Sequence, residues 1–137
     1  MQTLKEIKKE KIRDKVISQI RKAKKEILAT MDIAEELRHP LPIKYFSLLH
    51  KKHKEGIKIK RIIFSSIMQY KSFIDKMRDQ NLFFIGKHTK SKNYKRMILI
   101  DRTQLFFQKK IKGKEKFYFT TDNKYLKKYK AYFNRLK

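Results

Sequence analysis

Apolar residues near the start of the chain recur every three or four positions, which is the spacing of one face of a helix. This stripe consists of Ile12, Val16, Ile17, Ile20, Ala23 and Ile27, with polar and charged residues between them. We therefore predict a long basic amphipathic helix from Leu4 to about Lys25. Its stripe is expected to pack on the domain or to mediate dimerisation, because the aromatic anchors typical of membrane-surface helices are missing.

Between residues 26 and 64 the pattern alternates between short apolar runs and helical spacing. It predicts a buried strand at Glu26–Met31, a helix at Ile43–Glu55 ended by Gly56, and a strand at Ile57–Phe64. Asp32 and Glu35 have the spacing of a capping box that opens a further helical turn. A helix between two apolar strands is typical of the units that build parallel sheets.

The second half of the chain is dominated by strand patterns and ends in a helix. We predict a helix at Tyr70–Arg78, strands at Asn81–Ile85, Lys95–Asp101, Gln104–Gln108 and Phe117–Thr120, a polar loop at Gly86–Asn93, and a turn at Arg102–Thr103. Asp122 or Asn123 is expected to cap the last helix, whose apolar face comprises Leu126, Tyr129, Phe133 and Leu136. The sequence thus predicts one α/β domain over residues 1–137. Residues 1–25 form its helix, and residues 26–137 form a core with a mixed β-sheet flanked by helices.

The composition gives this domain an extreme positive charge. The 137 residues include 38 Lys and Arg against 13 Asp and Glu, which is a formal net charge of +25 at pH 7. Such an excess predicts a polyanionic partner, DNA or RNA. The alternative is a lysine content raised by an A/T-rich genome, but that bias would also raise the glutamate content, and acidic residues are few.

The lysines expected to contact phosphates lie on the predicted first helix and around residues 51–60. They are Lys8, Lys11, Lys15, Lys22, Lys51, Lys52, Lys58 and Lys60. Nothing in the sequence resembles a recognition helix or an aromatic stacking motif, so we expect binding with little sequence specificity. With no cysteine present, thiolate metal sites and disulfides are excluded, and no cofactor is predicted. Because no apolar run approaches the ~20 residues that span a bilayer and no signal-peptide pattern is present, we expect a cytoplasmic protein without membrane contact.

Four segments, taken in order, resemble one repeat of the phospholipase D-like superfamily. The opening A-K-x-E-I strand of that repeat is similar to Ala23-Lys-Lys-Glu-Ile27, and its x-G-V-x-V-x strand is similar to Glu55-Gly-Ile-Lys-Ile-Lys60. The H-x-K-x4-D spacing is found in Tyr94-Lys-Arg-Met-Ile-Leu-Ile-Asp101. The closing strand and helix are similar to the segment from Phe119 to Leu136. The resemblance spans nearly the whole chain. It implies a phospholipase D-like single repeat.

In active members of that superfamily, a histidine attacks phosphorus, a lysine holds phosphate oxygens and an aspartate orients the histidine. These positions fall on Tyr94, Arg96 and Asp101, and the Gly-Ser of active members falls on Gln108-Lys109. A phenol with a pKa near 10 cannot act as the neutral imidazole that attacks and leaves, whereas arginine still binds phosphate. The resemblance therefore implies a protein without catalytic residues, in which Tyr94, Arg96 and Asp101 form a vestigial anion site. The alternative is that Tyr94 and Arg96 pack at a dimer interface or a sheet edge.

Two histidine patterns offer other candidate sites. His88-Thr-Lys90 is a literal H-x-K, but Lys95 rather than an aspartate follows five residues later, and the triplet lies in the predicted polar loop. His50 and His53 share a helix face, but no third ligand is near them in the sequence. We expect solvated histidines and no metal site.

The basic first helix resembles the linker before the phospholipase D-like effector domain of TrmB-type archaeal transcription regulators, whose N-terminal winged helix these 137 residues do not include. Three functions are compatible with these observations. The first is a noncatalytic homodimer that binds nucleic acid through its basic surface, as a transcription-regulatory or accessory factor. The second is an effector-binding regulatory module of TrmB type, and the third is a degenerate phosphodiesterase or nuclease with Tyr94 as its nucleophile. The homodimer is predicted because active superfamily members bring two repeats together and this chain contains one.

Overall fold

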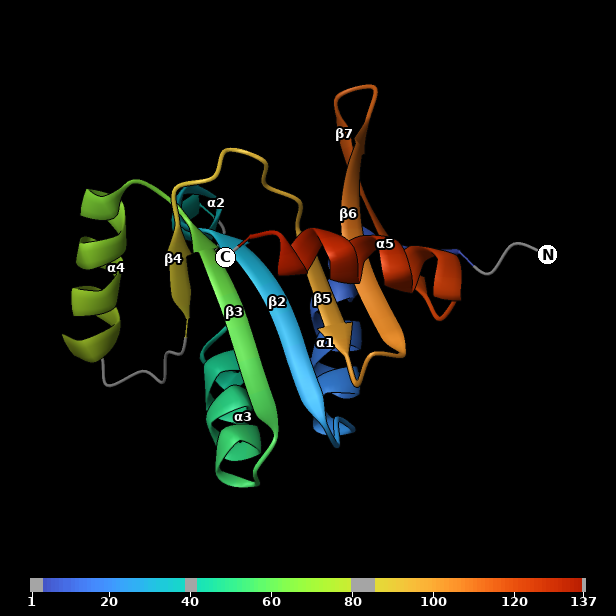
Figure 1. Cartoon of the computed structure of the whole chain (residues 1–137), viewed down its shortest axis with the longest axis horizontal. Coiled ribbons are helices and arrows are strands. Elements are labelled where there is room, and N and C mark those ends of the chain that lie inside the picture. Colours follow the sequence, from blue (N-terminus) through green and yellow to red (C-terminus); the bar gives the residue numbers. More distant parts are fainter. Residues whose placement is uncertain (1–3, 39–41, 80–85, 137) are drawn as a thin grey trace.

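The strands form one mixed sheet in the order β1-β7-β6-β5-β2-β3-β4, in a computed structural model that describes residues 4–38, 42–79 and 86–136 (Figure 1). Their bounds are Lys5–Ile7 (β1), Glu26–Asp32 (β2), Lys58–Phe64 (β3), Lys87–Thr89 (β4), Met97–Ile100 (β5), Gln104–Ile111 (β6) and Lys114–Thr120 (β7). Neighbours β2, β3 and β4 run parallel, and every other neighbouring pair is antiparallel. The predicted α/β class with a mixed sheet is confirmed.

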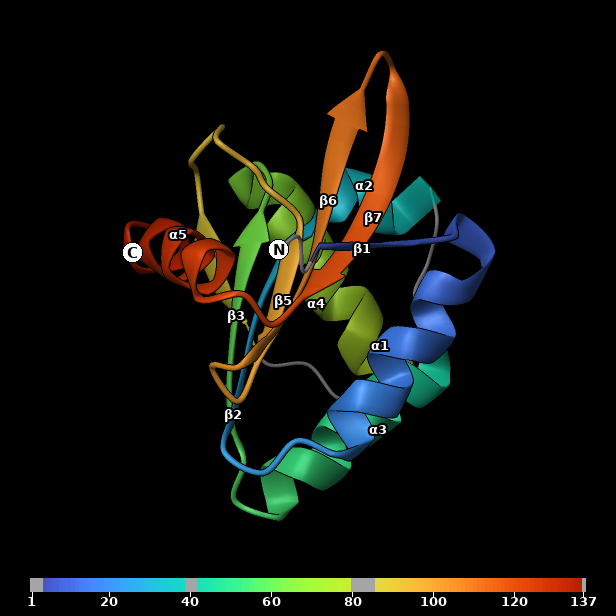
Figure 2. The same cartoon turned by 90° about the vertical axis from the view of Figure 1, so that its right-hand side faces the viewer.

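Helices cover both faces of this sheet. They are a 3₁₀ turn at Lys9–Lys11, α1 (Ile12–Arg21), α2 (Ile33–Arg38), α3 (Ile43–Lys54), α4 (Ile67–Asp79) and α5 (Asn123–Asn134). Helices α1 and α3 lie on one face, α5 crosses the other, and α4 stands beside the β4 edge (Figure 2). We call these two sides the α1 face and the α5 face.

Two hydrophobic clusters fill the layers on either side of the sheet. Ile27 and Met31 of β2 point into the cluster with α1 and α3, whereas Leu28 belongs to the cluster with α5. Because β2 is covered on both faces, its first six residues are all buried. This double cover explains why the sequence shows a continuous apolar run there instead of alternation.

The predicted long first helix is wrong at both ends. Residues Lys5–Ile7 form edge strand β1, where Ile7 pairs with Phe117 of β7 and becomes buried, and regular helix begins only at Ile12. The helix ends at Arg21, and Ile27, counted in its stripe, belongs to β2. As a strand, residues 5–7 gain backbone hydrogen bonds to the open edge of β7. As a helix they would bury little apolar surface, so the strand is the more stable of the two.

The segment Gly86–Asn93 also differs from the predicted polar loop, since Lys87–Thr89 is strand β4 and pairs in parallel with Ile62–Phe64. The strand predicted at Asn81–Ile85 lies outside the described residues. Helix α4 is longer than predicted, and β5 is shorter.

Turn and cap chemistry follows the sequence closely. Gly56 has φ +91° just beyond α3, and the Asp122 carboxylate accepts a hydrogen bond from the Lys124 amide as the cap of α5. Asp101 and Arg102 have φ of 55° and 62° in the turn between β5 and β6. The turn between β6 and β7 is Lys112-Gly113, with φ of 53° and 78°, which suits a two-residue hairpin connection.

Candidate anion site and nucleic-acid interface

Tyr94 and Arg96 lie together at the end of the sheet, in the extended segment before β5. The segment is held from both sides: the Thr30 hydroxyl donates to the Lys95 carbonyl (2.7 Å), and the Tyr132 hydroxyl accepts from the Lys95 amide (2.7 Å). Tyr132 also donates to the Asn93 carbonyl (2.6 Å). These bonds fix the backbone from which both side chains of the predicted site project.

Tyr94 and Arg96 both contact Glu35, a residue that no sequence pattern connects with them. Asp32 accepts a hydrogen bond from the Ala34 amide (3.1 Å) and so starts α2 directly after β2, which places Glu35 over the sheet end. Arg96 Nη1 lies 2.8 Å from Glu35 Oε1, and the Tyr94 hydroxyl donates to the same oxygen at 3.4 Å. The guanidinium is therefore already paired with a carboxylate of its own chain, with which any anion must compete.

The surroundings of Tyr94 keep its phenol protonated. Burial raises the pKa of Tyr94 far above its usual value, the negative charges of Glu35 and Asp32 raise it further, and Arg96 opposes them only in part. At neutral pH the hydroxyl is a hydrogen-bond donor, and the phenolate that nucleophilic attack requires is scarcely populated.

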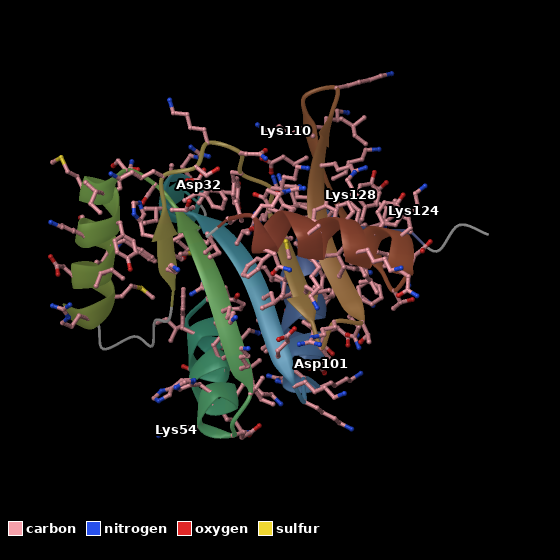
Figure 3. The ribbon with its side chains drawn as sticks, viewed as in Figure 1. Asp32, Lys54, Asp101, Lys110, Lys124 and Lys128 are labelled. Carbon is pink, nitrogen blue, oxygen red and sulfur yellow. The ribbon has the colours of Figure 1, made fainter. Side chains whose placement is uncertain are left out.

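Asp101 does not belong to this site, contrary to the role that the resemblance implied. Its carboxylate accepts hydrogen bonds from the backbone amides of Lys24 (2.9 Å), Lys25 (2.7 Å) and Glu26 (3.1 Å). These amides lie at the start of β2, whereas Glu35 follows its end, about 20 Å along the strand. Figure 3 labels Asp101 and Asp32 at opposite ends of the sheet. Asp101 fastens the β5–β6 turn to β2 and does not orient residue 94.

The acid–base behaviour of Asp101 agrees with a fastening role. Burial alone raises the pKa of the carboxyl, but the hydrogen bonds from the three amides lower it by more, so that it lies below its usual value. Beside it, Arg102 Nε donates to Glu26 Oε1 at 2.9 Å. The carboxylate form is thus the one that holds the turn.

A cavity of about 80 Å³ opens next to Tyr94 and Arg96, between the sheet and the α1 and α2 layer. Arg13 and Gln108 also line it. The Gln108 Oε1 is buried and has no hydrogen-bond partner among the described residues.

The predicted phosphate-contacting lysines are divided between two faces. Lys8, Lys11, Lys15, Lys22 and Lys51 are exposed beside the α1 face, on or next to the helices α1 and α3. Lys58 and Lys60 are exposed on the α5 face, because they alternate along β3 with Ile59, which packs under α1 and α3. The eight lysines therefore do not form a single continuous surface.

Lys52 is a correction to that set, because its side chain is buried. Its Nζ donates to the carbonyl oxygens of Arg21 (2.5 Å) and Ala23 (3.2 Å) and lies 3.6 Å from Glu55 Oε1. It lies one helical turn after buried Leu49, on the face of α3 that packs on α1. Lys52 therefore satisfies carbonyls at the C-terminal end of α1 and does not point to a phosphate.

Many acidic side chains form hydrogen bonds or ion pairs within the protein. Among the described residues, Glu6, Asp14 and Asp75 pair with Lys116, Lys44 and Arg78 at the surface. Six other acidic side chains hold parts of the fold together: Asp32 and Asp122 cap helices, Asp101 binds backbone amides, and Glu26, Glu35 and Glu55 pair with Arg102, Arg96 and Lys52. These carboxylates are not available to neutralise the outer lysines. The exposed surface consequently has a larger excess of positive over negative charge than the composition alone indicates.

Two lysine-rich elements were missed in the sequence reading. The β6–β7 hairpin carries Lys109, Lys110, Lys112, Lys114 and Lys116, and helix α5 carries Lys124, Lys127, Lys128 and Lys130 with no acidic residue. The signal was present as five lysines in the eight residues 109–116, around a glycine. Figure 3 labels Lys110 on the hairpin and Lys124 and Lys128 on α5.

The three histidines that the structure describes have local partners or exposed positions. His88 Nε2 lies 2.8 Å from the Ser65 carbonyl oxygen, and its ring stacks on Tyr70 with centroids 4.8 Å apart, so it fixes β4 beside α4. His50 and His53 are exposed on α3. Within the described ranges, no group of three or more side chains is arranged to hold a metal ion, and no helix is long and apolar enough to cross a membrane.

Comparison with known proteins gives a likeness of fold. No family model matches the chain, and no curated protein matches it. Among solved structures, it is similar to TrmBL2, an archaeal chromatin protein whose structure shows a novel mode of DNA binding, with a TM-score of 0.65 and 14% sequence identity. The match covers 98% of this chain and 51% of that one, so this chain spans about half the length of TrmBL2. The expected likeness to the TrmB branch is thus confirmed at the level of the fold, while the resemblance to the phospholipase D-like superfamily gains no support and stays a prediction.

Proposed function

We propose that this chain is a noncatalytic nucleic-acid-binding protein that neutralises phosphates with exposed lysines, as an accessory or transcription-regulatory factor. The observation that carries the proposal is the division of charge: six acidic groups are used within the fold, whereas most of the described lysines are exposed on its surface. Phosphate neutralisation releases condensed counterions, and this supplies affinity without reading any base. The shared fold with a chromatin protein described as binding DNA adds support.

The α1 face provides the first contact surface of this proposal. Exposed Lys8, Lys11, Lys15, Lys22 and Lys51 follow the 3₁₀ turn, α1 and α3, which pack on one another. For about five phosphate contacts, log K should fall against log salt with a slope near −4 to −5. Replacing Lys11, Lys15 and Lys22 together with Gln should flatten the slope by roughly two to three units.

This proposal is tested by fluorescence anisotropy on mixed-sequence duplex DNA over a series of salt concentrations. A matched control removes the same charge from α4, by Lys71→Gln, Lys76→Gln and Arg78→Gln, which are exposed and lie away from α1. The α1 variant should lose slope and the α4 variant should keep it. A complex that is insensitive to salt, or that one base-pair change abolishes, contradicts the proposal.

A phosphodiesterase is disfavoured by the site itself. Tyr94 is a buried donor to Glu35, and Arg96 is paired with the same carboxylate. We expect no turnover of nucleic-acid, lipid or simple diesters. Turnover by purified protein that falls with substitution of Tyr94 or Arg96 would overturn this expectation.

The cavity beside Tyr94 and Arg96 favours a second candidate, an effector-binding module. An arginine, a tyrosine hydroxyl and the Gln108 amide line one small space, and together they suit a small anionic or polar ligand. Calorimetric titration with small carboxylates and phosphates tests it. Saturable binding with little salt dependence, lost in Arg96→Gln, would favour this function over the first.

A further inference from the structure

The β6–β7 hairpin extends well beyond the body of the domain. Figures 1 and 2 both show its outer end projecting past the sheet and the helices. Residues Phe106 and Phe107 of β6 are buried, but every residue from Lys109 to Glu115 is exposed. The three β6 residues beyond the core, at about 3.4 Å each, give a free ribbon of about 10 Å.

The two faces of this ribbon carry different charges. Lys109 and Ile111 share the face of Phe107, and the strand register places Lys116 opposite Lys109 and Lys114 opposite Ile111. On the other face, Lys110 lies opposite Glu115. One face is therefore purely basic and apolar, while the other is balanced.

The basic face is costly for the free protein. Like charges directly opposite each other in an antiparallel pair are destabilising, and Lys109 and Lys116 are such a pair. Glu6 of β1, whose Oε1 lies 3.8 Å from Lys116 Nζ, offsets part of this repulsion. Ile111 is a large apolar residue, 40% exposed, close to the ribbon tip. Neither feature helps the hairpin to fold, but an anion between the lysines and an apolar contact at the tip would relieve both.

Helix α5 continues this face at the base of the ribbon. Tyr125 and Tyr129 pack their rings on Phe107, with centroids 5.8 and 4.8 Å apart, so α5 lies on the same side as Lys109. The outward lysines of α5 thus stand beside the ribbon. On the opposite edge of the ribbon, Ile7 pairs with Phe117, which brings Lys8 to the same base.

We propose that the β6–β7 hairpin enters the major groove of B-form DNA, with its lysines on the phosphates of both groove walls and Ile111 toward the base edges. This deepens, and rests on, the proposed nucleic-acid binding. The major groove of B-DNA is about 12 Å wide and 8.5 Å deep and admits a two-stranded β-ribbon. A free ribbon of about 10 Å is long enough to reach its floor.

The same geometry predicts discrimination between duplex DNA and duplex RNA. The major groove of A-form RNA is deep and too narrow for side chains to read, so the ribbon is excluded from it. RNA duplexes are then bound by surface charge alone. The hairpin lysines should therefore matter for DNA affinity and matter little for duplex RNA affinity.

The test uses the full chain and three charge-matched triple variants. The hairpin variant is Lys109→Gln, Lys114→Gln and Lys116→Gln; the α1 variant and the α4 variant are those defined above. Each is titrated against a DNA duplex and an RNA duplex of the same sequence at one moderate salt concentration and over a salt series. Because all nine positions are exposed or half-buried surface sites, folding is verified by circular dichroism and thermal melting.

The hairpin variant should bind the DNA duplex roughly tenfold or more weakly, with a slope flatter by two to three units, and should bind the RNA duplex within about twofold of the wild type. The α1 variant should weaken binding to both duplexes alike, and the α4 variant should change neither. Equal losses of the hairpin variant on DNA and RNA, or no loss on DNA, overturn groove entry while leaving the proposed function standing. Failure of the wild type to bind either duplex in a salt-dependent way overturns the proposed function itself.

Discussion

Replacing Asp101 with alanine tests whether this residue fastens the sheet, as its hydrogen bonds indicate. The change removes the acceptor of three backbone amides, those of Lys24, Lys25 and Glu26. The amides of Lys24 and Lys25 are exposed and can bind water once the carboxylate is gone. We therefore assign about 0.5–1 kcal/mol to each hydrogen bond, which is less than the free energy of a buried hydrogen bond to a charged group. The loss from hydrogen bonding is then about 2 kcal/mol.

The backbone adds to this cost. Asp101 has φ +55°, a left-handed conformation that aspartate tolerates better than alanine does. With about 0.5 kcal/mol for this term, the total is about 2.5 kcal/mol. Unfolding entropy near 2.1 cal/mol/K per residue gives about 0.29 kcal/mol/K for a chain of 137 residues, so the melting temperature should fall by roughly 9 °C.

The pH dependence of this loss has a definite sign. The pKa of Asp101 is lowered in the folded protein, so its bonds contribute fully above the unfolded pKa near 4 and are lost as the pH falls through the lower folded value. The gap in melting temperature between wild type and Asp101→Ala should be complete at neutral pH and should narrow below about pH 4. Only the small backbone contribution should remain once the pH is below the lower folded pKa.

Differential scanning calorimetry over a pH series measures this gap. Asp75→Ala, an exposed carboxylate on α4 whose ion pair with Arg78 is on the surface, is the control and should shift the melting temperature by less than about 2 °C. Asp101→Asn keeps one acceptor oxygen and should fall between the two. If the melting temperature of Asp101→Ala falls by no more than that of Asp75→Ala, or if its loss is unchanged at acid pH, Asp101 does not stabilise the fold through its carboxylate.

Three further expectations follow from the structure. Lys52→Met should lower the free energy of unfolding by about 2 kcal/mol and leave the salt slope of DNA binding unchanged, whereas Lys51→Met, one residue away and exposed, should leave stability nearly unchanged in chemical denaturation. Tyr132→Phe should cost about 1–3 kcal/mol, because its hydroxyl bridges the Asn93 carbonyl and the Lys95 amide; a loss below 0.5 kcal/mol would contradict this role. The predicted homodimer should give twice the chain mass in light scattering at tens of micromolar in moderate salt, and a monomer there would rule it out.

The parts of the fold that sequence predicted well are those with strong local patterns. Buried strands β2 and β3 appear as apolar runs because helices cover both of their faces, and the cap at Asp122 is local chemistry. Strands β1 and β4 were missed because each has three residues, with at most one apolar side chain in KEI and none in KHT. They are stabilised by pairing with strands that are distant in the sequence, and a local hydrophobic pattern cannot predict such pairing.

The site shows the same limit. The two-residue spacing of Tyr94 and Arg96 correctly placed their side chains together, but their partner Glu35 lies about sixty residues earlier and joins them only through the fold. Asp101 was misassigned because its carboxylate is used by amides 75–77 residues away. Lys52 was recognisable: it lies three residues after Leu49 on the apolar face of its helix, where a charged residue needs a buried partner.

The exposed lysines are proposed to bind duplex DNA by neutralising its phosphates. The measurement that tests this most directly is the salt dependence of wild-type binding to two unrelated duplexes of equal length. We expect a linear fall of log K against log salt with a slope of about −4 or steeper, and the same affinity within about threefold for both sequences. A slope near zero, or a strong preference for one duplex, would contradict it.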